Sequence, residues 1–312
     1  MELSIVIPVY NEEYNIGIVF TALKEVLELK LKTSWEVIFV DDGSSDKSWE
    51  IIERLALNNT QIKGFRFSRN FGHQYALKAG IDQAKGNAVI SMDADMQHPP
   101  SLIESFYEKW KEGYQIVNAI RKDTKGVGVA KKFSSHLFYK IMNFLSDVEI
   151  EDGASDFRLL DRKVVNQFKE MNEYFLFIRG IISWVGYNSI SIPYIAEERF
   201  SGQSKYTLKK MIRFAKDGVM SFSIKPLRLA TLLGFIISTF AFAYIVYALV
   251  AKYILHVTGM GWASLLISIL LIGGIQLITI GIIGEYIGKI FIALKHRPHY
   301  IISDHTEKPQ NS

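Results

Sequence analysis

The sequence contains no cysteine, which excludes disulfide bonds and thiolate metal sites and is compatible with a reducing compartment. It also lacks a strong excess of either charge, because its 312 residues carry a formal net charge of only +4. A balance this small gives no reason to expect nucleic acid as a partner. Charge is missing most clearly from residues 229–288, whereas residues 1–204 mix charged and apolar segments as a globular domain does.

Short apolar runs alternate with helical patterns along the first part of the chain. This alternation predicts an α/β domain with a mostly parallel sheet and right-handed crossovers. The expected strands are 3–9, 35–40, 62–67 and 88–92, and the expected helices include 15–29 and 74–84. We expect residues 152–162 to return to the sheet, and we expect no signal peptide before the first strand.

Polar or acidic residues follow three of these four strands where each strand ends. They are Asn11-Glu12, Asp41-Asp42 and Asp93-Ala94-Asp95. Ligands of parallel sheets bind along the carboxyl edge, where such residues gather. The repetition at successive strand ends therefore predicts a binding site at this edge of the sheet.

The segment Asp93-Ala94-Asp95 is the most informative of the three clusters. Two carboxylates one residue apart can hold a divalent cation, and oxygen ligands suit Mg²⁺ or Mn²⁺. Such a cation would neutralise a diphosphate leaving group. An Asp-x-Asp pattern alone is also typical of a solvated turn, and the second acidic pair, Asp41-Asp42, is what favours a site.

Two long uncharged segments, 229–251 and 263–284, follow the globular part. The first has 23 residues and would be about 34 Å long as a helix, enough to cross a bilayer core of roughly 30 Å. Lysine and arginine cluster outside both outer ends, so we expect a hairpin with both termini and the globular domain on the cytoplasmic side of the cell membrane. A helical hairpin buried in a soluble core is the alternative.

Residues 205–228 are basic with interleaved aromatic and methionine side chains, which is typical of helices lying on a membrane surface. An ordinary solvated helix is the alternative there. The predicted organisation is a globular domain at 1–204, interface helices at 205–228, two spans within 229–288 and a cytosolic basic tail at 289–312. Membrane lipids are therefore expected partners, and Gly284 and Gly288 leave homo-oligomers possible.

Several motifs together resemble those of the family 2 inverting glycosyltransferases with the GT-A fold. They are Pro8-Val9-Tyr10-Asn11-Glu12, Val40-Asp41-Asp42-Gly43-Ser44 and Asp93-Ala94-Asp95-Met96-Gln97. A further set resembles the polyprenyl-phosphate glycosyltransferases, particularly the bactoprenol glucosyltransferases of O-antigen modification. That set is Ser68-Arg69-Asn70-Phe71-Gly72, Ser155-Asp156-Phe157-Arg158-Leu159 and Gly284-Glu285-Tyr286-Ile287-Gly288. The resemblance extends to about His299.

The resemblance implies roles for individual residues. The nucleotide base and ribose would contact Pro8, Tyr10, Glu12, Asp42 and Asp41, and the ribose and diphosphate would lie near Asp93 and Ala94. The metal, Mg²⁺ or Mn²⁺, would be held by Asp95 with Asp93 and Gln97. Asp156 would lie at the reacting centre, where the alternative is a structural role capping Phe157 and Arg158.

Basic residues complete the implied site. Arg199 and Lys205 match residues that contact phosphates in the related dolichyl-phosphate mannose synthases. Arg121, Lys131 and Lys132 would hold the acceptor phosphate or the departing diphosphate, although 122–132 also has the composition of a solvated lysine-rich loop.

The implied reaction moves a hexose from a nucleotide-sugar, with UDP-glucose as the best candidate, to undecaprenyl phosphate, and inverts the anomeric centre. Another sugar donor remains an alternative, such as UDP-N-acetylglucosamine, GDP-mannose or an aminoarabinose derivative. A non-catalytic membrane scaffold is disfavoured because the acidic residues are all present, and a channel is disfavoured by the charge-poor spans. The Gln-x-x-Arg-Trp motif of processive synthases is missing, which favours a single transfer.

Overall fold

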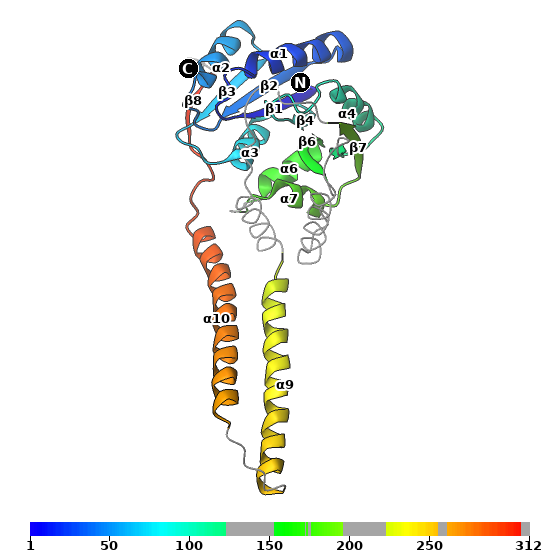
Figure 1. Ribbon diagram of the computed structural model, residues 1–312. Helices are drawn as coiled ribbons and strands as arrows, with labels where there is room; N and C mark the ends of the chain where they lie inside the picture. Colours follow the sequence, from blue (N-terminus) through cyan, green and yellow to red (C-terminus); the bar gives the residue numbers. More distant parts are fainter. Residues whose placement is uncertain (123–152, 172, 174–175, 196–222, 255–260, 307–312) are drawn as a thin grey trace.

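The computed structural model describes residues 1–122, 153–171, 173, 176–195, 223–254 and 261–306. A globular domain at one end carries two long helices that extend away from it (Figure 1). The domain is built on an eight-stranded sheet of order β7-β5-β6-β4-β1-β2-β3-β8. The strands are β1 (Leu3–Val9), β2 (Trp35–Asp41), β3 (Ile62–Phe67), β4 (Ala88–Ser91), β5 (Ile116–Lys122), β6 (Ala154–Asp161), β7 (Ser189–Ile195) and β8 (Ile302–His305).

The first four strands form a parallel unit in which β1 pairs with β2 and β4, and β2 pairs with β3. Every residue of β1 and β2 is buried. Helices cover both faces of these strands, so their sequences are mostly apolar instead of alternating, and the buried Ser4 and Glu36 are hydrogen-bonded to each other. The predicted α/β fold class with a mostly parallel sheet is confirmed.

The other half of the sheet is mixed. β6 runs antiparallel to both β4 and β5, while β7 runs parallel to β5. The predicted return of 152–162 to the sheet is confirmed by β6. Because β6 lies directly beside β4, Ser91 at the end of β4 pairs with Arg158. The residues around Asp156 are thereby brought next to the Asp93 turn.

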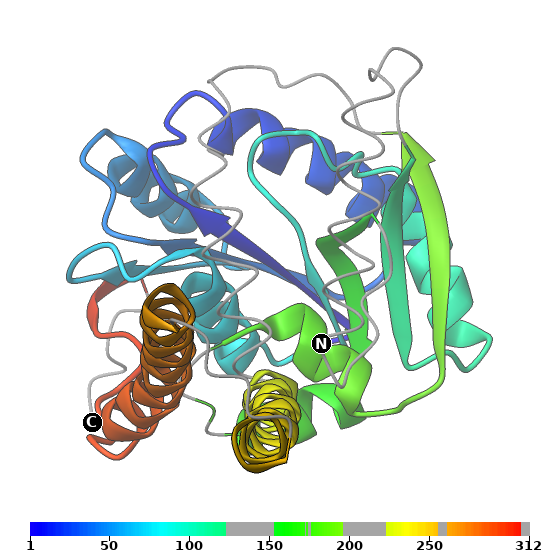
Figure 2. The same ribbon diagram turned by 60° about the horizontal axis from the view of Figure 1, so that its bottom comes forward.

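Helices pack on both faces of the sheet (Figure 2). One face is covered by α1 (Ile16–Lys24), which continues into a π-helical segment η1 (Glu25–Leu31), and by α2 (Ser48–Asn58) and α4 (Leu102–Lys111). The other face is covered by α3 (His73–Gln83), α6 (Arg162–Glu170) and α7 (Ile178–Trp184). Figure 1 shows α6 and α7 on the side of the domain that faces the two long helices.

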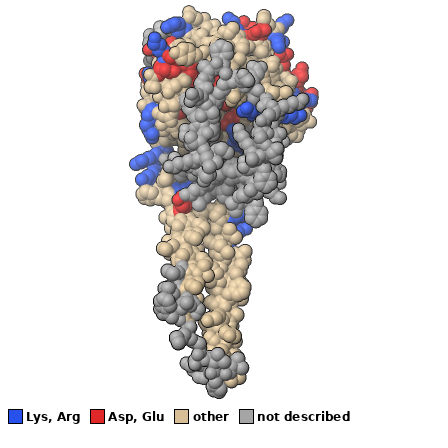
Figure 3. Space-filling model, viewed as in Figure 1, with Lys and Arg blue, Asp and Glu red and all other residues tan. Residues whose placement is uncertain are grey.

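The two long helices are α9 (Lys225–Tyr253) and α10 (Trp262–Ala293). Each is long and apolar enough to cross a membrane. Only 6% of the most apolar stretch of α9 is buried, and none of that of α10. In Figure 3 the described part of this pair is almost free of charge, whereas the domain above it carries Lys, Arg, Asp and Glu side chains. This exposure argues against the alternative of a hairpin buried in a soluble core.

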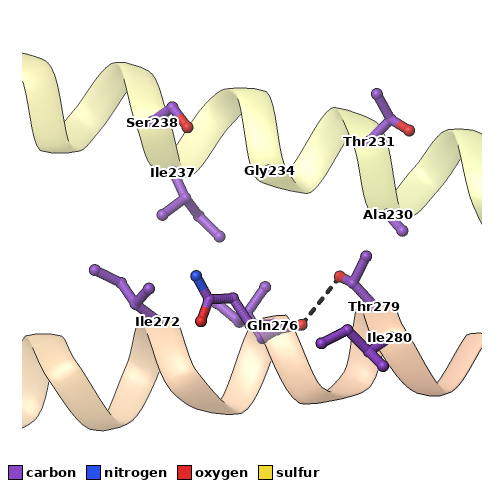
Figure 4. Close-up of a pocket in the computed structure, with 10 residues that line it drawn as sticks. Ala230, Thr231, Gly234, Ile237, Ser238, Ile272, Gln276, Thr279 and Ile280 are labelled. Atoms are coloured by element: carbon purple, nitrogen blue, oxygen red, sulfur yellow. Dashed lines mark hydrogen bonds between the residues drawn. The ribbon is translucent and has the colours of Figure 1, made fainter.

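The two helices are loosely packed against each other. A cavity of about 520 Å³ lies between them, and its lining includes Thr231 and Ser238 from α9 and Gln276 and Thr279 from α10. Figure 4 shows Gln276 directed toward α9. The hydroxyl of Thr279 donates to the carbonyl of Ile275 in its own helix, which satisfies this polar group without a partner helix.

The chain returns to the globular domain after α10, where the sequence predicted a basic tail at 289–312. β8 pairs antiparallel with the edge strand β3, and Thr306 and Gly64 exchange hydrogen bonds. Tyr300 stacks on Phe67 with ring centroids 5.0 Å apart, and its hydroxyl donates to Asp82 at 3.1 Å. Burial, together with Asp82, raises the pKa of Tyr300, so its hydroxyl stays a donor. Residues 289–293 of the predicted tail belong to α10, and the later part of the tail contains an edge strand that covers β3.

We expect Tyr300→Ala to lower the free energy of unfolding by about 3 kcal/mol, because the ring stack and its burial are lost. Tyr300→Phe should cost about 1 kcal/mol, because it removes only the hydrogen bond to Asp82. Denaturation of the full chain in detergent measures both, with the exposed His305→Ala as the matched control in the same segment. Equal stability of Tyr300→Ala and His305→Ala would contradict the packing of this segment on the sheet.

Candidate active site

The loops that follow β1 and β2 are joined by hydrogen bonds at the carboxyl edge of the sheet. The amide of Asn11 donates to Ser44 Oγ at 2.9 Å, and the amide of Ser45 donates back to Asn11 Oδ1 at 2.9 Å. The amide of Glu12 donates to Ser48 Oγ. These bonds fix the loop that contains Tyr10, a residue that is 40% exposed, at the carboxyl edge of the sheet. Pro8 is buried within β1.

The two aspartates at the end of β2 have different partners. Asp41 is fully buried, accepts from the amide of Ser44 and lies 3.4 Å from Nε of Arg66. Asp42 accepts from the amides of Phe71 and Gly72 at 2.7 to 3.1 Å. Burial raises the pKa of both carboxyl groups, and these hydrogen bonds oppose the rise. Asp42 therefore fixes the loop between β3 and α3, and its contact with a nucleotide base stays a prediction.

Gly43 allows this loop to approach the end of β2. Its φ is +69°, and a Cβ atom there would lie 2.6 Å from the backbone carbon of Arg69 and 2.8 Å from the backbone nitrogen of Asn70. Both the left-handed conformation and the close backbone contact require a residue without a side chain. Gly43 thus sets the distance between Asp42 and the loop that begins α3.

Asp93 follows β4 and lies between two histidines. Its amide donates to Nδ1 of His98, and Nε2 of His73 lies 3.4 Å from its Oδ1. The ring of His98 stacks on Phe157 with centroids 4.9 Å apart. This stack ties the Asp93 turn to β6.

Asp95 and Gln97 belong to the same turn, in which Met96 has a φ of +61°. Asp95 is buried and accepts from the amide of Gln97. Among the described residues, no three His, Asp or Glu side chains are arranged as a metal site. Oδ1 of Asp93 is buried and receives no hydrogen bond from the described residues. Two carboxylates with one such oxygen fit a cation whose other ligands come from a substrate.

Asp156 lies on β6 in the most densely charged part of the site. Nε and Nη2 of Arg179 donate to its two oxygens at 2.9 and 3.0 Å, which is a bidentate pair. Gln74 donates to Oδ2 at 3.2 Å, and Nη2 of Arg158 lies 3.5 Å from Oδ1. Burial would raise the pKa of Asp156, but Arg179, His73 and Arg158 together hold it well below its usual range. A carboxylate in this setting is a weak proton acceptor.

His73 connects the two acidic positions. Its Nε2 lies 3.4 Å from Asp93 and 3.7 Å from Asp156. The side chain is 43% exposed, so it is only partly shielded from water. That shielding lowers its pKa, but the charge of Asp93 and the contact with Asp156 outweigh it and raise the pKa to about 9. His73 is the first residue of α3, directly after the loop held by Asp42, so the ends of β2, β4 and β6 meet there.

The structure thus brings Asp93 and Asp156 together, with Asp95 and Gln97 in the same turn as Asp93. Arg121 is exposed near the end of β5, opposite Tyr194 on β7, and among the described residues it forms no ion pair with Asp93 or Asp156. Burial raises the pKa of Tyr194, and Arg121, Asp93 and Asp95 all influence it. Lys131, Lys132, Arg199 and Lys205 lie outside the described residues.

Sequence reasoning missed four residues that surround Asp156: His73, Gln74, Arg158 and Arg179. Two of them had a readable signal. Arg179 is the sole charged residue in the apolar segment 175–185, and a charge there needs a buried partner. Arg158 alternates with Asp156 along a strand and therefore shares its face. No comparable signal marks His73 or Gln74.

Comparison with known proteins gives matches over nearly the whole chain. The family model for glycosyl transferase family 2 matches residues 4–168, and the model for the GtrB C-terminal hairpin matches residues 225–290. A bactoprenol glucosyl transferase of Shigella phage SfV is 41% identical and covers 99% of this chain and 100% of its own. Uncharacterised glycosyltransferases of Synechocystis sp. and Bacillus subtilis are 46% and 44% identical, each over 97% of this chain and over 95% and 93% of their own.

The fold, the acidic sheet edge and these matches define a glycosyltransferase that is associated with a membrane through its two apolar helices. The chain belongs to glycosyl transferase family 2.

We expect Gly43→Ala to lower the free energy of unfolding by about 3 kcal/mol, from left-handed strain and backbone overlap together. Gly186→Ala is the matched control, because Gly186 has a φ of +70° but its Cβ would meet no atom closer than 4.0 Å. That variant should lose about 1 kcal/mol from strain alone. Equal losses in the two variants, measured by denaturation, would contradict the role of the Gly43 contact.

Proposed function

We propose that this enzyme transfers glucose from UDP-glucose to the phosphate of undecaprenyl phosphate at the cytoplasmic face of the cell membrane. One observation carries the proposal. The chain combines two features: an acidic carboxyl edge of a parallel sheet, where His73 contacts both Asp93 and Asp156, and an exposed apolar hairpin. The naming of the phage relative as a bactoprenol glucosyl transferase supports glucose and this lipid.

The chemistry is a single displacement at the anomeric carbon. An oxygen of the lipid phosphate forms the new bond to C1 while the bond from C1 to the diphosphate oxygen breaks, and UDP leaves with that electron pair. An α-linked donor then gives a β-linked product. A phosphate monoester has a second pKa of about 6, so it reacts largely as a dianion and needs no strong base.

Asp156 accordingly acts by positioning and charge balance. Its low pKa and its pairing with Arg179 support this role over that of a proton acceptor. The difficult requirement is to bring an anionic acceptor to an anionic donor, and fixed positive charges at the site reduce that repulsion.

A divalent cation, Mg²⁺ or Mn²⁺, would be held by Asp93 and Asp95 with Gln97. It would supply charge neutralisation of the departing diphosphate. Oδ1 of Asp93 is buried and receives no hydrogen bond from the described residues, although Nε2 of His73 lies 3.4 Å from it, so a cation held there would compete with this imidazole. Asp95 belongs to the same turn.

The hairpin gives the acceptor a fixed depth. A polyprenyl chain lies in the hydrocarbon layer and its phosphate lies at the headgroup level, so an enzyme anchored beside it needs to search only along the surface. The positive residues at the ends of α9 and α10 nearest the globular domain, among them Lys225, Arg228 and Lys289, support a cytoplasmic domain by the positive-inside rule.

Purified full-length enzyme tests the proposal when it is incubated with undecaprenyl phosphate and a panel of radiolabelled donors. We expect a labelled lipid with UDP-glucose and much less with UDP-N-acetylglucosamine or GDP-mannose. A product from another donor alone would replace glucose, and no lipid product from any donor would overturn the proposal.

Asp95→Ala should lower metal-dependent turnover by at least about a hundredfold, because the cation loses a buried ligand. Membrane insertion should be unchanged, because α9 and α10 are intact. Asp304→Ala, an exposed aspartate on β8, is the matched control and should keep full activity. The measurement is lipid product formation with and without a chelator, and unchanged turnover of Asp95→Ala would refute the metal role.

A further inference from the structure

Two arginine side chains, those of Arg158 and Arg179, share the single carboxylate of Asp156. Arginine keeps its charge at any physiological pH, and the pKa of Arg158, although lowered by burial, stays at about 10. Arg158, Arg179 and Asp156 together therefore carry one net positive charge, and His73 connects them to the carboxylate of Asp93. A group of this kind suits an anionic ligand.

Arg158 has a buried donor atom that finds no acceptor among the described residues. This atom is Nε, and the residue is 3% exposed. Its Nη2 donates to the carbonyl of Ser155 at 2.6 Å. A buried guanidinium with an unsatisfied donor is a source of positive potential directly behind Asp156.

Arg179 is the member of the cluster that a ligand can reach. Its side chain is 25% exposed, whereas those of Asp156 and Arg158 are 9% and 4% exposed. The bidentate pair with Asp156 fixes the plane of the guanidinium, which lowers the entropy lost when it binds a second group. Fixed planar guanidinium groups are well suited to phosphate oxygens.

The position of Arg179 indicates which phosphate it meets. It lies on α7, on the side of the domain that faces α9 and α10 in Figure 1. Trp184, at the end of the same helix, is 65% exposed, and exposed tryptophan is typical of the headgroup layer of a membrane. The contacts of Asp156 and Asp93 through His73 place Arg179 beside the reacting edge of the sheet.

We propose that Arg179, oriented by Asp156 and backed by the charge of Arg158, binds the phosphate of the lipid acceptor. Asp156 is then a positioning residue that acts through Arg179. This inference rests on the proposed function for the identity of the acceptor, and it adds a residue that the acidic motifs do not include. The donor diphosphate offers the same chemistry, so the experiment must separate the two phosphates.

The test compares wild type with Arg179→Gln and Arg179→Lys in full-length enzyme, varying each substrate while the other is saturating. For Arg179→Gln we expect the KM for undecaprenyl phosphate to rise about tenfold or more, the size of a lost charged hydrogen bond. The KM for UDP-glucose should change less than about twofold. For Arg179→Lys, the KM for undecaprenyl phosphate should lie between those of wild type and Arg179→Gln, because lysine keeps the charge and loses the planar bidentate pair.

The matched control is Arg162→Gln. Arg162 directly follows β6 at its other end, and its Nε donates to the carbonyl of Gly86 at 2.8 Å, away from the cluster. Both KM values should be unchanged in this variant. A rise in the KM for UDP-glucose in Arg179→Gln, or a fall in kcat with both KM values unchanged, would overturn the assignment.

A binding measurement separates recognition from folding and from the proposed reaction. Wild type should bind undecaprenyl phosphate more tightly than undecaprenol, and Arg179→Lys should reduce this ratio by about tenfold. A purely structural role would weaken both lipids equally, which would overturn the inference. If wild type transfers no sugar to any lipid, the proposed function fails, whereas the ratio of phosphate to alcohol binding still decides the role of Arg179.

Discussion

The arrangement of the site depends on the ion pairs and hydrogen bonds of the buried Asp156 carboxylate. A buried charge is stable only when it is paired and hydrogen-bonded, and removal of one partner is strongly destabilising. Asp156 obtains its partners from three elements: Gln74 at the start of α3, Arg179 on α7 and Arg158 on its own strand. Ser91 at the end of β4 donates to its backbone carbonyl. The two helices on this face therefore cannot shift independently of the sheet edge.

The loop after β3 carries this constraint to the other half of the site. Asp42 accepts the amides of Phe71 and Gly72, and the next residue is His73. The position of the imidazole is thus fixed from the end of β2, while its contacts are made with residues that follow β4 and lie on β6. One short loop links the region expected to hold the nucleotide with the region expected to hold the acceptor.

Much of the fold could be predicted from the sequence because its signals are local. Parallel strands buried on both faces appear as mostly apolar runs, and the membrane helices appear as long uncharged segments. The acidic clusters could be placed at one edge because the carboxyl ends of parallel strands meet there. The prediction that Asp93 and Asp156 share a site needed the family resemblance, because the two residues are 63 positions apart along the chain.

The remaining features depend on contacts between distant parts of the chain. His73 and Gln74 begin an ordinary helix, and their role follows only from the return of β6 beside β4. The four residues of β8 are too few to show a strand period, and they form a strand because β3 presents an unpaired edge. The role of Asp42 in holding the Phe71 loop is likewise invisible before the approach of that loop to Gly43 is known.

The return of the chain to β3 has a mechanical consequence. The polypeptide leaves the sheet, forms both apolar helices and rejoins the same sheet at β8, so the globular part has attachments at both ends of the hairpin. A body on one tether can swivel freely, whereas a body on two tethers has restricted tilt and rotation. If the proposed acceptor lies in the bilayer, this double attachment would keep the acidic sheet edge at a restricted angle and height above it, and the acceptor would meet that edge in a narrow range of orientations.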